Sequence, residues 1–496
     1  MPPRTTLERA IAALALASGL ATVVFVVHAF LFSPQNPVAA EIGFEALRVA
    51  RGLRLYVDPW QGAWEDGPPP ARYYVLYTPM FPWLVGKLTA LVTSGAPTLA
   101  SVRVVGRVLA TAGWVTVHLA PVLLAPAKGD APRRRVTAAF ALLGAGIYFV
   151  ARHGPSMSPD AVATALLCLG VLRAVRVGRY DALALVLVVA APFVKPSCIG
   201  GIAGAGLVHL VVGLRLDPRA RWLRATAAGI ATALVLAGLS HVASEGQWLS
   251  NIKSSTGQPL TLTRWVQELG SRVMVLGIPH AIVAWLAWRR RCTWLVTGPL
   301  LGSIAWTCFI MAKHGSGSHY WLEPTGLALV AIARMPAPPD GEPAWIARAI
   351  PWGALVFGVL GAIVSWPEYL REPGRYRHHD EVVRLIDRHC VRAPGSFVVS
   401  SDLELELSLN GRFSVPAWQS GFLARSGRFP VDAWRADLVR PEVRWLALAI
   451  DPRAPPGTSN DEQVELSPFY DVLKDVVLDH YAFDAVVGGV FVFKRR

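Results

Sequence analysis

Ionisable side chains are rare in this sequence, and several of them stand at the edges of long apolar runs. Only 17% of the 496 residues are charged, against about 25% in an average soluble protein. A charge beside a hydrophobic span is costly, so each one is a functional candidate. Carboxylates there can act as a general base, and cations can bind an anion. The candidates are Glu41, Glu45, Asp160, Glu323, Lys195, Lys313, His153, His314 and His319.

The first two acids lie in a segment that predicts an amphipathic helix. This helix carries Glu41 and Glu45 and ends near Gly52, because glycine is the usual residue just after a helix C-terminus. An aromatic stretch that includes Arg72 and Tyr77 follows. An interfacial helix with an aromatic belt would give the same pattern, so that alternative stays open.

Two further motifs place single charges at the ends of apolar runs. Asp160 follows Ser158-Pro159 and opens a run, where it either takes part in chemistry or caps a helix. Lys195 precedes Pro196 and ends another run. Its ammonium group either holds a phosphate or reaches back to the membrane interface.

The segment 313–324 combines cations with a glycine-serine turn. Lys313 and His314 precede Gly-Ser-Gly-Ser, and His319 and Tyr320 follow it, with Glu323 in the next turn. Such a turn at the start of a helix offers backbone donors and positive charge to an anion. A plain connection between helices is the alternative.

Long apolar runs must position these residues. The sequence is 53% hydrophobic, with a mean hydropathy of +0.40, and runs of about 20 apolar residues predict an α-helical polytopic membrane protein. The runs lie at about 10–32, 73–94, 101–126, 136–151, 160–177, 181–194, 198–214, 222–243, 272–288, 292–311, 320–335 and 346–366.

The net charge of +14 indicates membrane topology. The distribution of the basic residues argues against nucleic-acid binding, because no basic stripe is interleaved with aromatic residues. Basic residues in short loops mark the cytoplasmic side. The amino terminus is then cytoplasmic, and the loop 33–72 and the C-terminal domain face the outside of the plasma (inner) membrane. The four basic loops contain Lys128, Arg133, Arg134 and Arg135; Arg173, Arg176 and Arg179; Arg215, Arg219, Arg221 and Arg224; and Arg289, Arg290 and Arg291.

One of the twelve apolar runs does not fit this orientation as a span. Between the outer loop 33–72 and the inner loop 127–135 the chain must cross an odd number of times, yet two runs lie there. The run 73–94 contains Pro79, Pro82 and Lys87, so we expect it to dip into the outer leaflet without crossing. Eleven spans remain, within a range of 10 to 13.

The composition changes after residue 366, which predicts a transmembrane domain over 1–366 and a soluble α/β domain over 367–496. We expect a strand near 395–402 that runs into a helix, a strand near 444–451, and a hairpin over 486–494. Asp402, Glu404 and Glu406 stand at alternate positions, and we expect them on a solvated surface.

In their order and spacing these motifs resemble the GT-C-fold membrane glycosyltransferases, the group that includes protein O-mannosyltransferases and aminoarabinose-lipid A transferases. The resemblance extends over nearly the whole chain. It rests on the acid-bearing first loop with its Tyr-Thr-Pro, on Ser-Pro-Asp160, on Phe-Val-Lys195-Pro-Ser, and on the segment from Lys313 to Pro324.

The resemblance implies transfer of a sugar, with inversion, from a polyprenyl-phosphate carrier to a protein, lipid or glycan acceptor on the extracytoplasmic face. It implies a first-loop acid as base, Glu41 before Glu45, with Asp160 assisting. Lys195, Lys313 and His319 would face the phosphate, and a hydrophobic groove between spans would hold the isoprenoid tail. Further substrate contacts would come from His314, Tyr320, Glu323, Arg72 and Tyr77.

The sequence differs from the family at the position of the residue that acts as general base. The family usually has an aspartate about fourteen residues before the glycine, where this chain has Pro37 or Val38, and Glu41 follows about one helical turn later. No cofactor is predicted with certainty, and no residue is assigned to a metal, although Glu41 and Asp160 leave a divalent metal open. The alternatives are a transporter or flippase of lipid-linked sugars and a non-catalytic protein of envelope assembly.

Overall fold

A computed structural model describes most of the chain, which divides into two compact units. Unit 1 comprises Met1–Ser33, Gly106–Leu239 and Pro259–Arg371, and unit 2 comprises Pro34–Val105, Ser240–Gln258 and Glu372–Arg496. The described residues are 6–32, 37–53, 55, 78–124, 131–216, 218–244, 246, 248–249, 252, 260–268, 276–312, 318–390, 396–411, 420–421, 424, 427, 431–454, 469 and 471–496.

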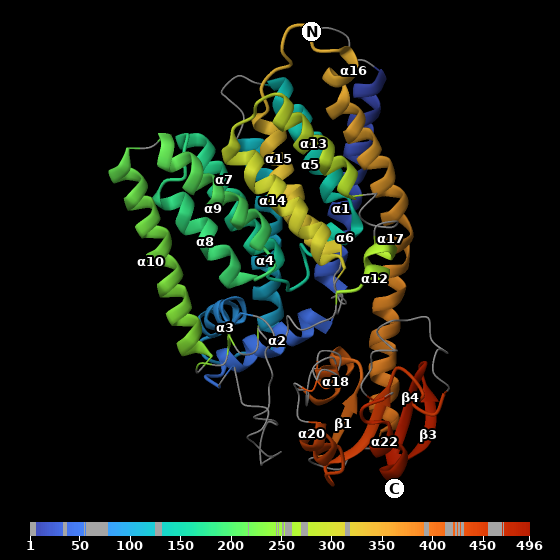
Figure 1. Ribbon diagram of the computed structural model, residues 1–496. Helices are drawn as coiled ribbons and strands as arrows, with labels where there is room; N and C mark the ends of the chain where they lie inside the picture. Colours follow the sequence, from blue (N-terminus) through green and yellow to red (C-terminus); the bar gives the residue numbers. More distant parts are fainter. Residues whose placement is uncertain are drawn as a thin grey trace. The chain divides into compact units, whose positions relative to one another are not determined.

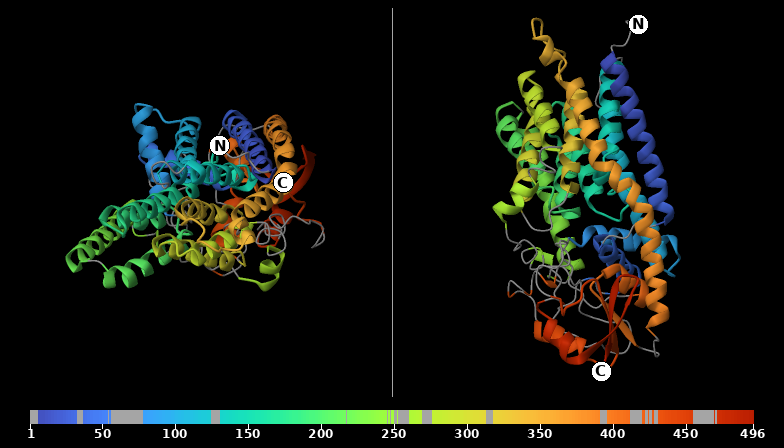
Figure 2. Two further views of the ribbon diagram at one scale, coloured as in Figure 1. Left: turned by 90° about the horizontal axis from the view of Figure 1, so that it is seen from above. Right: turned by 90° about the vertical axis from the view of Figure 1, so that its right-hand side faces the viewer.

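Unit 1 is a bundle of apolar helices (Figures 1 and 2). Shorter helical pieces in this unit are α6 (Tyr148–Ala151), α12 (Leu262–Glu268), η2 (Ser318–Trp321) and α16 (Ala344–Ala347). The long helices are α1 (Thr6–Phe32), α4 (Leu99–Leu124), α5 (Ala131–Ala145), α7 (Asp160–Val177), α8 (Ala182–Val194), α9 (Ile199–Leu216), α10 (Arg219–Ala243), α13 (Ile278–Arg289), α14 (Trp294–Ile310), α15 (Leu322–Arg334) and α17 (Ala349–His389). Residues 99–105 of α4, 240–243 of α10 and 372–389 of α17 belong to unit 2.

Each of these long helices coincides with one of the eleven apolar runs predicted to cross the membrane. By length and composition, α1, α4, α10 and α17 are the four described helices that are long and apolar enough to do so. The prediction of an α-helical polytopic membrane protein with a C-terminal α/β part is therefore confirmed. The cytoplasmic and extracytoplasmic assignments stay predictions.

The core of unit 1 forms around α15. Every residue from Leu322 to Ala333 is buried, and the helix contacts α5, α7, α13 and α14. A helix that is apolar on all sides is expected to lie inside a bundle. Its Thr325 hydroxyl lies 3.0 Å from Nε2 of the buried His280 on α13, which gives both polar groups a partner within the core.

Helices α9 and α14 approach each other through glycines. Gly200 and Gly204 of α9 lie four residues apart, as do Gly298 and Gly302 of α14. A Cβ atom added to Gly204 would collide with the carbonyl oxygen of Gly298, and one added to Gly302 would collide with that of Gly200. Small residues at this spacing let helix backbones pack closely in a membrane.

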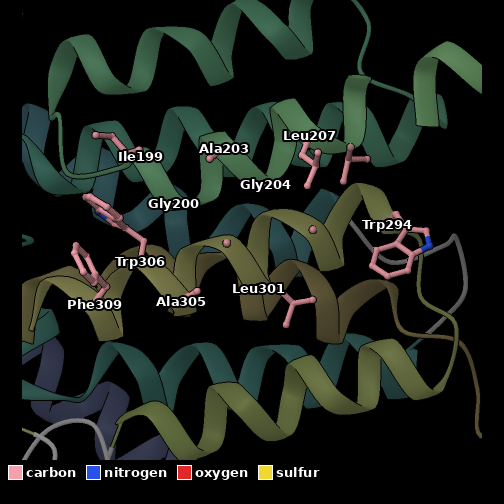
Figure 3. Close-up of a pocket in the computed structure, with 13 residues that line it drawn as sticks. Ile199, Gly200, Ala203, Gly204, Leu207, Trp294, Leu301, Ala305, Trp306 and Phe309 are labelled. Carbon is pink, nitrogen blue, oxygen red and sulfur yellow. The ribbon is translucent and has the colours of Figure 1, made fainter. Parts of the chain in front are cut away.

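Beside these glycines an apolar groove of about 810 Å³ opens between α9 and α14. Figure 3 shows Ile199, Trp306 and Phe309 toward one end and Leu207 and Trp294 toward the other. The glycines keep its floor free of side chains. The residues that line the groove are apolar.

Unit 2 contains two short helices from the first part of the chain, α2 (Pro37–Ala50) and α3 (Met80–Val92), which pack on each other. A Cβ atom on Gly86 of α3 would lie 2.6 Å from the carbonyl oxygen of Ala46 on α2, so glycine is required at this contact. Helix α3 lies within the run 73–94. Its place relative to the membrane stays a prediction.

The C-terminal part of unit 2 is a small α/β fold. Its strands β1 (Phe397–Ser400), β2 (Val443–Leu448), β3 (Tyr481–Val487) and β4 (Val490–Arg495) form one sheet in the order β1-β2-β4-β3. Strands β1 and β2 are parallel, and β3 and β4 form the predicted hairpin. Its helices are α18 (Leu403–Asn410), α20 (Val431–Leu438) and α22 (Lys474–His480). The predicted strands and the helix after β1 are therefore present.

The prediction of a solvated surface is right for Asp402, which is exposed, and wrong for Glu404 and Glu406. Glu404 and Glu406 are 2% and 1% exposed. Glu406 accepts a hydrogen bond from the backbone N–H of Ser400 at 2.8 Å, and Glu404 pairs with Arg103 at 2.5 Å. The alternation of leucine and acid does not indicate a wet face, because α18 is buried on both sides.

We expect Gly204→Ala to destabilise the bundle by about 1–3 kcal/mol, because the new methyl group must push α14 away. Gly206→Ala is the matched control, since a Cβ atom at Gly206 on the same helix meets nothing within 4 Å. Thermal unfolding of both variants in one detergent checks this. Equal melting temperatures would contradict the packing argument.

The stability of unit 2 should depend on pH through Glu404. Burial, opposed by the charge of Arg103, raises the pKa of this carboxyl group from 4.5 to about 7. As the pH rises through this interval the unfolded chain releases a proton that the folded chain retains, so stability is lost. Relative to Glu404→Gln, the wild type should lose about 3 kcal/mol of unfolding free energy between pH 5 and pH 8. Melting curves of both proteins across this range test the expectation; a pH-independent difference contradicts it.

Candidate active site

A helical hairpin in unit 1 brings together Asp160 and Lys195. Helix α7 begins at Asp160 and ends at Val177, and the following Gly178 has a φ of 80°, in the left-handed region that favours glycine. Helix α8 begins after Asp181, whose side chain accepts the N–H of Ala184, and runs back to Lys195. The two antiparallel helices therefore place the first residue of one beside the last residue of the other.

The two side chains form a buried ion pair. Lys195 Nζ lies 3.4 Å from Asp160 Oδ2, and the residues are 4% and 5% exposed. Lys195 has the extended backbone that a following proline imposes, with φ of −145° and ψ of 112°. Its ammonium group thus points to a carboxylate, and the alternative of a lysine that reaches for the membrane interface does not describe it.

The carboxylate of Asp160 is held by the turn before it. Ser158 donates a short hydrogen bond to Oδ2, while Pro159 occupies the N-cap position without any side-chain cap. The capping alternative for Asp160 is therefore not what is observed. Met157 anchors the turn on α4, since a Cβ atom at Gly106 would collide with its side chain.

Two histidines and a tyrosine adjoin this pair. The rings of His153 and His319 are 5.0 Å apart, and those of His319 and Tyr320 are 4.2 Å apart. Among the neighbours of the Asp160 carboxylate, Lys195 interacts with it most strongly, followed by His319 and His153. Burial, reinforced by His319, lowers the pKa of His153 to about 3, so this imidazole is neutral at pH 7. The cluster can bind both hydroxyl groups and an anion.

Glu323 on α15 lies against the first turn of α9. Its Oε1 accepts the backbone N–H of Gly201 at 2.8 Å, and the residue is 6% exposed. Gly201 lies in the first turn of α9, where backbone N–H groups have no partner within the helix. Glu323 of α15 thus caps α9, and this bond fixes the start of α9 just after Lys195. Its predicted substrate contact stays a prediction.

The acids of the predicted first-loop helix lie in unit 2. Glu41 and Glu45 are on α2 and both are fully buried. Their spacing of four residues places them on one side of the helix, and Arg48 follows three residues later on that side. Convergence of these acids with the Asp160 cluster stays a prediction.

Four of the predicted site residues lie outside the described residues. They are Arg72, Tyr77, Lys313 and His314. Among the described residues, no group of three or more His, Cys, Asp or Glu side chains could hold a metal ion. The divalent metal therefore stays a hypothesis.

Sequence reasoning gave no role to two residues of this site, Ser158 and Gly201, and did not say which helices form the expected groove. Ser158 holds Asp160, and its signal is the hydroxyl two residues before an acid that opens a helix. Gly201 admits Glu323, since a Cβ atom there would lie 2.5 Å from Oε1. The groove was signalled by the two glycine pairs of α9 and α14, each with a spacing of four.

The arrangement of the chain is similar to that of solved membrane proteins. ArnT from Cupriavidus metallidurans in the apo state matches with a TM-score of 0.55 and 13% identity, over 96% of this chain and 97% of that one. ArnT bound to undecaprenyl phosphate matches with a TM-score of 0.54 and 13% identity, over 97% of both chains. The oligosaccharyltransferase AglB from Archaeoglobus fulgidus, with an inhibitory peptide and a dolichol-phosphate, gives 0.49 and 11% identity, over 98% of this chain and 74% of that one.

No sequence family and no curated protein matches the chain. The two ArnT structures nevertheless cover nearly the whole of both chains. The chain therefore has the GT-C fold that its motifs predict. At 13% identity, this similarity establishes the fold alone.

The Asp160–Lys195 pair should show strong energetic coupling. Either Asp160→Asn or Lys195→Met leaves one buried charge without its partner and should cost about 3–5 kcal/mol. The double variant should cost less than the sum by about 1 kcal/mol or more. The control is the more accessible pair Arg173–Asp181, 2.7 Å apart with side chains 42% and 20% exposed, where coupling should be below about 1 kcal/mol. Thermal unfolding of both cycles provides the values, and additive effects at Asp160 and Lys195 would contradict the pairing.

Proposed function

We propose that this chain is an integral-membrane glycosyltransferase that uses a polyprenyl-phosphate-linked sugar and acts on the extracytoplasmic face. The buried Asp160–Lys195 pair carries the proposal, because an apolar bundle retains such charges at a functional site. The GT-C fold supports the same class of activity. The fold supports glycosyltransferase activity by analogy, since one fold can host several functions.

The apolar groove supports a lipid-linked donor. Its end at Ile199 lies four residues after Lys195 in the chain. Trp306, which lines that end, donates from Nε1 to the carbonyl oxygen of Ser197 at 3.0 Å. Groove and ion pair thus share the turn between α8 and α9. An isoprenoid tail in the groove would place its phosphate near the Lys195 ammonium group.

The proposed reaction is a single inverting displacement. The Glu41 carboxylate, or that of Glu45, takes the proton of the acceptor hydroxyl group. The acceptor oxygen bonds to C1 of the sugar as the C1–O bond to the phosphate breaks. The polyprenyl phosphate leaves with its negative charge, which Lys195, Lys313 and His319 stabilise. Asp160 keeps Lys195 in place and lowers the mobility of its ammonium group.

Substitution of the proposed base tests this function. Glu41→Gln should lower turnover about 10²–10⁴-fold, because the amide cannot accept the proton, and Glu45→Gln should lower it less. Asp432→Asn, at an exposed position of the C-terminal domain, is the control and should keep wild-type turnover. The measurement is transfer of radiolabelled sugar from a polyprenyl-phosphate donor by the purified protein in detergent.

Full turnover in Glu41→Gln, Glu45→Gln and Asp160→Asn together would overturn the proposed mechanism. A wild-type protein that moves the lipid-linked sugar between leaflets of a vesicle, without releasing polyprenyl phosphate, would be a flippase instead. A protein that does neither would fit the third alternative, a role in envelope assembly.

A further inference from the structure

Helix α18 of the C-terminal domain is apolar on two opposite sides. Leu405 and Leu409 pack against the sheet, in a cluster with Val398. Leu403 and Leu407 belong to a different cluster, which contains residues of α2. Each pair is spaced by about one turn, so the alternating sequence of α18 gives one short helix two separate contacts.

The side toward the sheet is fixed by polar contacts as well. Asp402 caps the helix by accepting the N–H of Glu404 at 2.9 Å. Asn410 at the other end donates to the carbonyl oxygen of Val398 at 2.8 Å and accepts its N–H at 3.1 Å. The Asn410 bonds, together with the bond from the Ser400 N–H to Glu406, join α18 to β1.

The other side holds α2. Leu403 and Leu407 are 4% and 1% exposed and share one apolar cluster with Ala40 and Phe44 of α2. Ala40 directly precedes Glu41, and Phe44 directly precedes Glu45. Any displacement of this contact therefore moves the backbone that carries the two acids.

A buried ion pair reinforces the same attachment. Arg103 at the start of α4 donates from Nη2 to Glu404 Oε1 at 2.5 Å, with side chains 19% and 3% exposed. Ser408 donates to the same oxygen at 3.2 Å. The first part of the chain thus contacts α18 twice, once through α2 and once through α4.

We propose that α18 positions α2, so that the C-terminal domain sets the place of the acids proposed as the catalytic base. This inference rests on the proposed function. Leu403, Leu407 and the Arg103–Glu404 pair are then positioning residues, which act on Glu41 and Glu45 through the α2 backbone. The C-terminal domain is a structural part of the active site in addition to any role in acceptor binding.

A matched pair of truncations on one helix tests the proposal in the full-length protein in detergent. Leu407→Ala removes the contact with α2, and Leu409→Ala removes the same atoms on the side of the sheet. We expect amides of residues 37–50 to exchange with deuterium about tenfold faster in Leu407→Ala, and to stay within about twofold of wild type in Leu409→Ala. Leu407→Met, which keeps the volume, should restore wild-type exchange.

Turnover provides the second readout. Leu407→Ala should lower kcat about tenfold and leave KM for the donor within about twofold, because the base is displaced while the donor site is intact. Arg103→Met, which creates no cavity in the leucine cluster, should also lower kcat, but by less than Leu407→Ala does. It replaces Leu407→Ala if that variant does not fold.

The two readouts separate this proposal from the proposed function. Unchanged exchange of α2 in Leu407→Ala, or equal acceleration in Leu409→Ala, overturns the positioning by α18 whatever the turnover. Faster exchange with unchanged kcat overturns its catalytic part. A wild-type protein without turnover overturns the proposed function, and the exchange comparison still decides whether α18 holds α2.

Discussion

The pairing of two buried charges constrains the construction of unit 1. Removing a carboxylate and an ammonium group from water costs several kcal/mol for each ion, and close contact with added hydrogen bonds is needed to offset it. Asp160 and Lys195 meet this condition only because α7 and α8 turn back on each other and because Pro196 directs the lysine. Ser158 and the cap of Glu323 on Gly201 then hold the two ends of the arrangement.

The missing side chains of the glycines on α9 and α14 both allow close helix packing and leave the groove open. The absence of side chains at Gly200, Gly204, Gly298 and Gly302 lets the two backbones meet, which compensates for the weak hydrophobic drive between helices in lipid. The same absence leaves the groove floor open beside the contact. Close packing and an apolar groove are thus compatible, and a bulkier residue at any of these four glycines would disturb the packing.

The sequence predicted helices and strands better than side-chain partners. Apolar runs of sufficient length require helices in lipid, so all eleven proposed spans coincide with helices, and the hairpin around Gly488 followed from its turn residues. Partners depend on which helix faces which, and no local pattern encodes that. Asp160 and Lys195 were found as candidates because charge is rare, yet their contact needed the hairpin of α7 and α8. Glu404 was misread because its partner Arg103 lies 301 positions away.

Because Glu41 lies on a helix, its position can be compared with position 37 or 38, where the resembled family has the aspartate that serves as general base. Residues three or four apart on a helix share a face and differ by about 5 Å along its axis. Glu41 therefore lies on the same side of α2 as position 37 or 38, where the family has its aspartate. Because Glu41 comes three or four residues later, it lies about 5 Å further along the axis of α2 than position 37 or 38. A glutamate side chain is one methylene longer than that of an aspartate, which offsets part of this difference of about 5 Å in position along the helix. Two contacts hold α2: its packing on α3, and the apolar cluster that Ala40 and Phe44 share with Leu403 and Leu407 of α18. If Glu41 is the base, the level of its carboxylate depends on these contacts, and the proposed role of α18 concerns the second of them.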